Sequence, residues 1–220
     1  MNSLVESARG LIFDMDGTLV DNCRCHVVAW QSFARRYGHD LSAEDILAWM
    51  GAQGAYYLER IFGRKLDAAE VARYSAEKEG IYRELFKSQM ACPAGLAALL
   101  EASARRGAQL AVATGGPREN VDFVLEGLNL RRYFGVIVDS SSYSKSKPDP
   151  ECFLTAASRL GLKPCDCLVF EDATNGIQAA KAAGMAVVAI THTNPRAVLE
   201  VAQPDLIIDS YTELESEKVQ

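Results

Sequence analysis

Short, unbroken apolar runs recur along this chain and constrain its fold more than any other feature. The first run spans residues 9–14 and reads Arg-Gly-Leu-Ile-Phe-Asp, without the polar–apolar alternation of a half-exposed strand. Comparable runs cover residues 109–113, 135–139, 167–170, 186–190 and 205–209. Strands buried on both faces of a parallel sheet show this pattern, and helix-length segments separate most of the runs. The sequence therefore predicts an α/β fold with a doubly wound, Rossmann-like parallel sheet.

Residues 21–90 differ in texture from the rest of the chain. They contain amphipathic stretches, such as residues 27–37 and 68–86, and no convincing strand pattern. We therefore predict an α/β catalytic core formed by residues 1–20 and 91–220, with a small helical domain inserted after the first strand. Such an insert would lie over the carboxyl edge of the sheet, where α/β folds bind ligands, and is typical of a cap.

Prolines and glycines mark the expected ends of helices in the second half of the chain. Pro93 is expected to begin a helix that Gly107 ends. Pro117 and Pro150 would begin two more helices, and Gly161 stands where a C-cap belongs. Strands and helices are therefore expected to alternate after the insert.

Charge and hydropathy exclude several classes of partner. A net charge of −6 in 220 residues lacks the basic excess that nucleic-acid binding requires. No apolar run approaches the roughly 18 residues of a membrane span, and residues 1–10 have no signal-peptide pattern. We expect a cytoplasmic monomer that binds a small molecule, and neither nucleic acid nor a membrane.

The six cysteines do not form a recognisable metal site. The pairs Cys23/Cys25 and Cys165/Cys167 lack the two-residue gap of common zinc knuckles. We expect Cys167 to face the core and the other cysteines to be partly exposed thiols.

Two carboxylates stand where the first strand is expected to end, in residues 13–18, Phe-Asp-Met-Asp-Gly-Thr. Side chains i and i+2 leave a strand on the same side, so Asp14 and Asp16 would point into one crevice. An unperturbed aspartate has a pKa of about 4, so Asp14 would be an anionic nucleophile at neutral pH. Asp16 could act as acid and then as base if its pKa is raised. A solvated turn is the alternative, because Asp-Gly is common in turns.

This Asp-x-Asp-Gly-Thr segment resembles the first motif of the haloacid dehalogenase-like superfamily, and segments resembling its other motifs follow in order. Residues 112–116, Val-Ala-Thr-Gly-Gly, resemble the second motif, in which the Thr114 hydroxyl and backbone N–H groups such as that of Gly115 can bind a phosphoryl oxygen. Residues 146–150, Ser-Lys-Pro-Asp-Pro, resemble the third, whose lysine, here Lys147, neutralises the nucleophile and the phosphoryl oxygens. Alone, the second segment would be an ordinary loop and Lys147 a surface residue.

Residues 170–177, Phe-Glu-Asp-Ala-Thr-Asn-Gly-Ile, resemble the fourth motif, in which adjacent acids complete a magnesium site. Taken alone, Glu171 and Asp172 could instead be acids at a helix N-terminus. All four segments stand at the carboxyl ends of separate predicted strands, so a doubly wound sheet would bring them into one crevice. The resemblance extends from about residue 10 to residue 209.

The second aspartate indicates the kind of chemistry, because family members that cleave carbon–halogen bonds lack an acid at the position of Asp16. The resemblance implies attack by Asp14 on phosphorus to give an aspartyl-phosphate, while Asp16 protonates the leaving oxygen and then activates water. It also implies Mg²⁺ held by Asp14, the backbone carbonyl of Asp16 and Asp172, with Glu171 bound directly or indirectly. Thr114 and Lys147 complete the expected catalytic set.

Within the insert, residues 26–30, His-Val-Val-Ala-Trp, resemble a segment of β-phosphoglucomutases and related sugar-phosphate phosphatases. His26 could orient Asp16 or a sugar hydroxyl, and the alternative is that it lies on the packed face of its helix with Trp30. Lys78 could reach a polar substrate, and the alternative is a solvated helix face. Gln53 is a further candidate for substrate binding, as a neutral donor suited to hydroxyl groups.

The resemblance to the mutases fails at one point. They carry a lysine before the glycine that corresponds to Gly51 and an arginine three residues after it, where this chain has Met50 and Gly54. In a mutase that arginine would grip the second phosphate of a bisphosphate, so its absence favours hydrolysis of a monophosphate.

We therefore expect a Mg²⁺-dependent phosphatase for a sugar or polyol phosphate, since a helical cap of about 70 residues encloses a small ligand. The alternatives are a β-phosphoglucomutase-type isomerase, an inorganic pyrophosphatase with the same chemistry, and a non-catalytic binding module. Such a module would be expected to have lost Asp14, Asp16, Lys147 or Asp172, and the chain retains all four.

Overall fold

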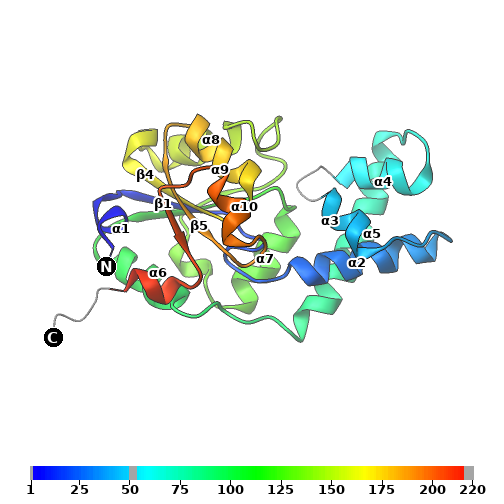
Figure 1. Cartoon of the computed structure of the whole chain (residues 1–220), viewed down its shortest axis with the longest axis horizontal. Helices are drawn as coiled ribbons and strands as arrows, with labels where there is room; N and C mark the ends of the chain where they lie inside the picture. The colour runs from blue at the N-terminus through cyan, green and yellow to red at the C-terminus, as the bar shows by residue number, and fades with distance from the viewer. Residues whose placement is uncertain (1, 50–53, 216–220) are drawn as a thin grey trace. The chain divides into compact units, whose positions relative to one another are not determined.

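The computed structural model describes residues 2–49 and 54–215 of the chain (Figure 1). The chain divides into two compact units. One consists of Met1–Asp21 together with Ala91–Gln220, and the other of Asn22–Met90.

The first unit is built on a parallel six-stranded sheet. Its strands are β1 (Gly10–Phe13), β2 (Gln109–Ala113), β3 (Val136–Val138), β4 (Cys167–Glu171), β5 (Ala186–Ile190) and β6 (Leu206–Ile208). The order across the sheet is β3-β2-β1-β4-β5-β6. The predicted Rossmann-like parallel sheet is confirmed. Because the order reverses between β1 and β4, a crevice for ligands is expected at the carboxyl ends of these two strands.

The register of the central strands brings three chain segments to the same edge. Phe13 at the end of β1 pairs with Val112 of β2 on one side and with Phe170 of β4 on the other. The residues that follow in the three strands, Asp14, Ala113 and Glu171, therefore reach the carboxyl edge together.

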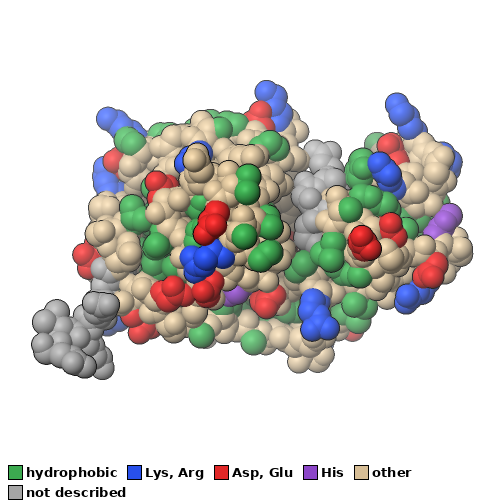
Figure 2. Space-filling view, viewed as in Figure 1, with side chains coloured by type: hydrophobic (Ala, Val, Ile, Leu, Met, Phe, Trp, Pro, Cys, Tyr) green, Lys and Arg blue, Asp and Glu red, His purple; other side chains and the backbone are tan. Residues whose placement is uncertain are grey.

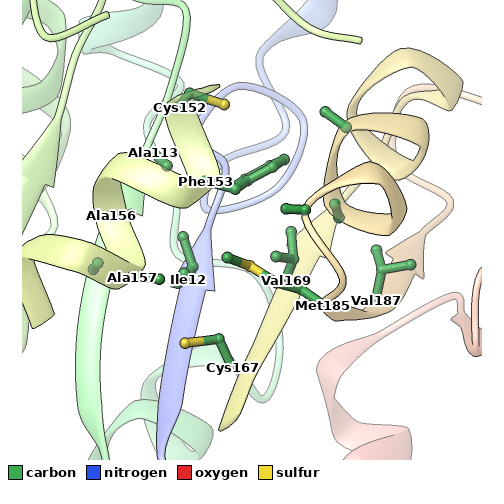
Figure 3. Packing of buried hydrophobic residues seen from close by; sticks show 14 of the residues in the cluster. Ile12, Ala113, Cys152, Phe153, Ala156, Ala157, Cys167, Val169, Met185 and Val187 are labelled. Carbon is green, nitrogen blue, oxygen red and sulfur yellow. The ribbon is translucent and has the colours of Figure 1, made fainter. Parts of the chain in front are cut away.

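Helices cover the sheet of this α/β unit. They are α1 (Ser3–Ser7), α6 (Leu96–Arg105), α7 (Arg118–Gly127), α8 (Glu151–Leu160), α9 (Thr174–Ala182) and α10 (Arg196–Glu200), with 3₁₀ turns η1 (Arg131–Tyr133), η2 (Pro164–Asp166) and η3 (Tyr211–Leu214). Figure 3 shows Ile12 and Val169 of the sheet beside Phe153 and Ala156 of α8. These four side chains are fully buried, and burial of each large apolar side chain stabilises the fold by about 1.5–3 kcal/mol.

Most of the predicted helix ends agree with the structure, and one does not. Pro117 and Pro150 are the N-caps of α7 and α8, and Gly161 ends α8 in the left-handed conformation, as predicted. Pro93, however, does not begin its helix, because α6 starts only after Gly95. Gly95 has a φ of 81°, and a side chain there would collide with the main chain of η3, so the close approach of η3 delays the helix.

The second unit is helical throughout its described residues. It contains α2 (Cys23–Arg36), α3 (Ala43–Ala48), α4 (Gly54–Phe62) and α5 (Ala68–Lys87). Capping boxes begin α3 at Ser42 and α5 at Asp67. Aromatic rings form much of its core: Trp30 stacks on Tyr57 at 4.6 Å, and both rings are buried. The packed position expected as the alternative for Trp30 is therefore correct.

The described surface carries mixed charges. Figure 2 shows acidic and basic side chains interspersed over the α/β unit. Among the described helices, none is both long enough and apolar enough to cross a membrane.

All six cysteines lie in the described part of the chain, and none is joined in a disulfide. Cys167 is buried in the core, as predicted, but Cys25 and Cys152 are buried as well. The expectation that the other thiols are partly exposed is wrong for these two. Cys152 packs from α8 into the sheet cluster (Figure 3), because it lies on the apolar face of that helix.

Candidate active site

Three charged side chains from separate segments meet at the carboxyl edge of the sheet. Asp14 directly follows β1, Glu171 ends β4, and Lys147 lies in the loop before α8. Lys147 Nζ donates to Asp14 Oδ1 and to Glu171 Oε1, each at 2.6 Å. None of the three side chains is more than 10% exposed. One buried ammonium group therefore bridges two buried carboxylates.

Burial and neighbouring charges shift the pKa values of Asp14 and Lys147. Loss of solvation raises the pKa of Asp14 from 3.8 to about 7, against the attraction of Lys147, and the charges of Glu171 and Asp16 add to the rise. Burial alone would lower the pKa of Lys147, but the attraction of Asp14 and Glu171 outweighs it and raises this pKa well above its usual value. The reference pKa of about 4 used in the sequence analysis does not include this burial, which a sequence does not show.

Hydrogen bonds and an ion pair fix the position of the Glu171 carboxylate. Its Oε2 accepts hydrogen bonds from the backbone N–H groups of Asp172 at 2.8 Å and Ala173 at 3.0 Å, while Oε1 binds Lys147. A side chain at Gly176 would collide with the Glu171 carboxylate, so the glycine leaves room for it. Both carboxylate oxygens of Glu171 are thus engaged within the protein.

Asp172 lies beside Glu171 and is 4% exposed. Burial, followed by the charges of Glu171 and Asp14, raises the pKa of Asp172 well above its usual value. Thr18 Oγ1 donates to Asp172 Oδ1 at 3.5 Å. A buried carboxyl group with like charges around it is neutralised either by a proton or by a nearby cation.

Asp14, Glu171 and Asp172 form a compact cluster of possible metal ligands. Each offers a carboxylate oxygen, and these oxygens lie within 4.8 Å of one another. Hard oxygen donors of this kind match the preference of Mg²⁺, and a divalent cation would relieve the repulsion that raises the pKa values. The donor set therefore fits a magnesium ion.

Asp16 and Thr114 flank Gly116 at the same edge. From the point where a Cβ of Gly116 would lie, Thr114 Oγ1 is 3.4 Å away and Asp16 Oδ2 is 3.5 Å away. Thr114 Oγ1 accepts from the backbone N–H of Gly116 at 3.0 Å, which leaves the hydroxyl proton to donate to another acceptor. Gly115 lies between Thr114 and Gly116 in the sequence. The structure thus brings Asp14 and Asp16, the loop that contains Thr114, and Lys147 to one edge of the α/β unit.

Residues outside the four motifs also contact this site. Tyr143 donates its hydroxyl to the backbone oxygen of Thr114 at 3.2 Å. After β5, Asn194 Nδ2 donates to the backbone oxygen of Asp172 at 3.0 Å, and His192 Nδ1 lies 3.1 Å from the backbone oxygen of Gly17. We did not single out Tyr143, His192 or Asn194 from the sequence. The available signal was position, since both loops follow the carboxyl ends of parallel strands.

His26 and Lys78 lie together in the helical unit. Lys78 Nζ is 2.9 Å from His26 Nδ1 and donates to Glu79 Oε1 at 2.9 Å. The ring of His26 stacks on that of Tyr82, with 3.9 Å between centroids. Lys78 is only 3% exposed, so the interpretation that it lies on a solvated helix face is wrong. It is buried because Trp30 covers its ammonium group, 5.0 Å from the ring centroid. Gln53 lies outside the described residues.

Comparison with known proteins agrees with this arrangement. The chain belongs to the haloacid dehalogenase-like hydrolases, and the match to that family spans residues 11–190. It is 35% identical to the fructose-1-phosphate phosphatase YqaB of Escherichia coli (strain K12), over 83% of this chain and 96% of the relative. It is 31% identical to hexitol phosphatase A of the same organism, over 94% and 93% of the two chains. The family and these named relatives make the chain a phosphohydrolase.

A solved structure shows the same fold. The β-phosphoglucomutase of Clostridium difficile superposes with a TM-score of 0.82 at 27% identity, over 94% of this chain and 93% of the mutase. The similarity covers nearly the full length of both proteins.

Proposed function

We propose that this enzyme is a Mg²⁺-dependent phosphatase that hydrolyses a sugar or polyol monophosphate through an aspartyl-phosphate at Asp14. The observation that carries the proposal is the 2.6 Å contact between Asp14 Oδ1 and Lys147 Nζ, next to the acids Glu171 and Asp172. A buried carboxylate at the edge of a parallel sheet, paired with a cation, is positioned to attack an anionic phosphoryl group.

In the first step, a carboxylate oxygen of Asp14 forms a bond to phosphorus while the bond from phosphorus to the ester oxygen breaks. Asp16 donates a proton to the departing alkoxide, which leaves as the free alcohol. In the second step, Asp16 takes a proton from water, the water oxygen attacks phosphorus, and the bond from phosphorus to Asp14 breaks. Phosphate is released and both carboxylates return to their starting states.

Lys147 and the Thr114 loop would hold the phosphoryl oxygens. The ammonium group of Lys147 carries charge that can balance these oxygens as well as the nucleophile. The Thr114 hydroxyl has a proton to donate, because Gly116 N–H already occupies it as an acceptor. The backbone N–H of Gly115 is the further donor that we assign to the phosphoryl group.

Asp14, Asp172 and the backbone carbonyl of Asp16 would hold Mg²⁺. When bound, the ion screens the negative charges of the nucleophile and the phosphoryl group from each other. We assign Glu171 an indirect role, because Lys147 and two backbone N–H groups already engage both of its carboxylate oxygens. In this position Glu171 orients Lys147 and the main chain of Asp172.

The names of the relatives support a sugar or polyol phosphate as the substrate. A fructose-1-phosphate phosphatase and a hexitol phosphatase both match over most of their length. We propose that His26, Lys78 and Gln53 provide the polar contacts that recognise the substrate. The buried ammonium group of Lys78, next to an imidazole ring, is suited to bind hydroxyl or phosphate oxygens.

Hydrolysis is favoured over isomerisation. The two relatives compared by sequence are named as phosphatases. Gly54, the first residue of α4, has no cationic side chain that could bind a second phosphate. The similarity to β-phosphoglucomutase and the chemistry shared with pyrophosphatases make those two activities the alternatives to exclude. A monomeric state and a cytoplasmic location remain part of the proposal.

The test is release of inorganic phosphate from a panel of substrates, with Mg²⁺ and with EDTA. The panel contains fructose 1-phosphate, hexitol phosphates, glucose 1-phosphate, nucleotides and pyrophosphate. The proposal expects a hexose or polyol phosphate to exceed nucleotides and pyrophosphate by about a hundredfold or more in kcat/KM, which corresponds to about 3 kcal/mol of discrimination. Conversion of glucose 1-phosphate to glucose 6-phosphate, or preference for pyrophosphate, would contradict it.

A further inference from the structure

Three consecutive residues after β5 contact the segments that carry the acids of the site. They are His192, Thr193 and Asn194, and the two segments are the turn with Asp14 and Asp16 and the end of β4 with Glu171 and Asp172. The three residues belong to none of the four motifs, and the proposed mechanism assigns them no role. The segment lies between β5 and α10 in the α/β unit.

Asn194 fixes the main chain of Asp172. Its Nδ2 donates to the backbone oxygen of Asp172 at 3.0 Å. On the other side of the same residue, the backbone N–H of Asp172 donates to Glu171 Oε2 at 2.8 Å. The peptide groups on both sides of Asp172 are therefore held, which limits rotation of the residue that carries the carboxylate.

His192 fixes the turn that carries Asp14 and Asp16. Its Nδ1 lies 3.1 Å from the backbone oxygen of Gly17, and a carbonyl oxygen only accepts, so Nδ1 carries the proton in this hydrogen bond. The ring also packs edge-on against Tyr211, with 6.4 Å between centroids. Tyr211 in turn donates its hydroxyl to the backbone oxygen of Thr18 at 3.2 Å. The turn after β1 is thus tied to the end of β5.

Thr193 lies where these two segments meet. A Cβ at Gly17 would collide with both the Asp172 carboxylate and the Thr193 hydroxyl. The glycine backbone, the Asp172 carboxylate and the Thr193 hydroxyl are therefore packed tightly around one point. The segment after β5 therefore contacts both the turn and Asp172.

We infer that His192 and Asn194 are positioning residues that set the spacing of the magnesium ligands by tying the Asp14–Asp16 turn and Asp172 to the end of β5. This inference rests on the proposed function. Residues that orient metal ligands typically contribute about 10- to 100-fold to metal affinity. Loss of either contact should therefore weaken Mg²⁺ binding while leaving substrate recognition unchanged.

The experiment compares wild-type enzyme with Asn194→Ala, His192→Phe and His192→Asn, and with Thr191→Val as the matched control. Thr191 lies in the same segment, but its hydroxyl donates to Asp209 Oδ1 at 2.7 Å, on the surface. Two quantities are measured for each protein. One is the Mg²⁺ concentration that gives half of the metal-induced rise in Tm, and the other is KM for the best phosphate ester at saturating Mg²⁺.

Asn194→Ala and His192→Phe are expected to raise the half-saturating Mg²⁺ concentration about tenfold, with KM changed less than about twofold. His192→Asn, which can present an amide N–H at the position of Nδ1, should recover most of the affinity. Thr191→Val should behave as wild type. Wild-type Mg²⁺ dependence in both Asn194→Ala and His192→Phe would overturn the inference, and so would a change in KM or metal-free Tm alone.

The outcome separates this inference from the proposed function. If the wild-type protein shows neither a Mg²⁺-induced rise in Tm nor metal-dependent phosphate release, the proposed function fails and the inference fails with it. If the wild-type protein shows both and the variants match it, only the inference fails.

Discussion

Lys147 and Asp14 form the central contact of the site, with Nζ of the lysine 2.6 Å from Oδ1 of the aspartate. Glu171 Oε1 lies at the same distance from Nζ on its other side. The lysine thus offsets the repulsion between two carboxylates that reach the sheet edge from neighbouring strands. This one contact links the stability of the site to its proposed chemistry.

Lys147→Met is expected to damage both activity and stability. Removal of one partner from a buried ion pair typically costs about 3–5 kcal/mol, because the other charge stays buried without compensation. The cost should be larger at pH 8 than at pH 6, where the Asp14 carboxyl group, whose pKa is raised to about 7, can take up a proton instead. Loss of a charge that stabilises the transition state should lower kcat about a hundredfold or more. Urea unfolding at both pH values and steady-state kinetics measure these effects.

Lys145→Met is the matched control, because Lys145 lies two residues earlier with a side chain that is 72% exposed. It should change the free energy of unfolding by no more than about 0.5 kcal/mol. Equal effects of the two substitutions would show that Lys147 contributes no more to the free energy of unfolding than an exposed lysine does.

The second prediction concerns pH and Mg²⁺. The pKa of Asp14 is raised by burial to about 7, so the folded protein holds a proton between about pH 4 and pH 7 that the unfolded chain has released. This group therefore lowers the stability of the metal-free protein as pH rises through that range. Mg²⁺ must displace the proton, so the rise in Tm caused by Mg²⁺ should be larger at pH 8 than at pH 6.

Thermal unfolding with Mg²⁺ and with EDTA at the two pH values measures this difference. Asp14→Asn should reduce it, since an amide does not titrate. A rise in Tm that is the same at pH 6 and pH 8 in the wild-type protein would disagree with the raised pKa.

Tyr143→Phe tests the support of the Thr114 loop. The Tyr143 hydroxyl donates to the backbone oxygen of Thr114 at 3.2 Å, and burial raises the pKa of this hydroxyl to about 12, so it stays protonated and can donate. Loss of one hydrogen bond of about 1 kcal/mol should raise KM about fivefold and change kcat less. Tyr133→Phe removes an exposed hydroxyl bonded to Glu101 and should leave KM unchanged. A wild-type KM in Tyr143→Phe would exclude a role for this contact.

Lys78→Met tests substrate recognition by the helical unit. The change keeps an apolar stem beside Trp30 and removes the ammonium group next to His26. KM for the preferred sugar or polyol phosphate should rise about tenfold, as for loss of a hydrogen bond to a charged group. Hydrolysis of para-nitrophenyl phosphate, which lacks sugar hydroxyls, should change little. Lys87→Met, at an exposed position of the same helix, is the control. Equal losses for both substrates would show that Lys78 acts through folding instead.

The central strands of the sheet were predictable because both of their faces are buried. Runs such as residues 10–13 and 186–190 are apolar throughout, and an unbroken apolar run is what a central parallel strand requires. The start of α6 was less accessible to sequence reasoning. It depends on the approach of η3 to Gly95, a contact between segments more than a hundred residues apart in the chain.

Some residues of the candidate site could likewise be predicted from the sequence, and others could not. Asp14, Lys147 and Glu171 could be named because each belongs to a short motif at a predicted strand end, and the structure places them in contact. His192 and Asn194 act through backbone oxygens, and any residue type supplies such an oxygen, so no motif marks the contact.

Lys78 shows a different limit of sequence reasoning. A lysine in an amphipathic helix usually faces solvent, and its burial depends on Trp30 of another helix. Its neighbours in the sequence do not reveal that partner.

The most direct test of the central claim is phosphate release by Asp14→Asn beside the wild-type enzyme, on the best substrate of the panel and at saturating Mg²⁺. If Asp14 is the nucleophile, turnover should fall by about 10⁴-fold or more, and excess Mg²⁺ should not restore it. The Tm in EDTA should fall less than that of Lys147→Met, because Lys147 still pairs with Glu171, and a folded protein without turnover shows that the loss is chemical. Turnover within tenfold of the wild type would contradict the aspartyl-phosphate route and the role assigned to Asp14.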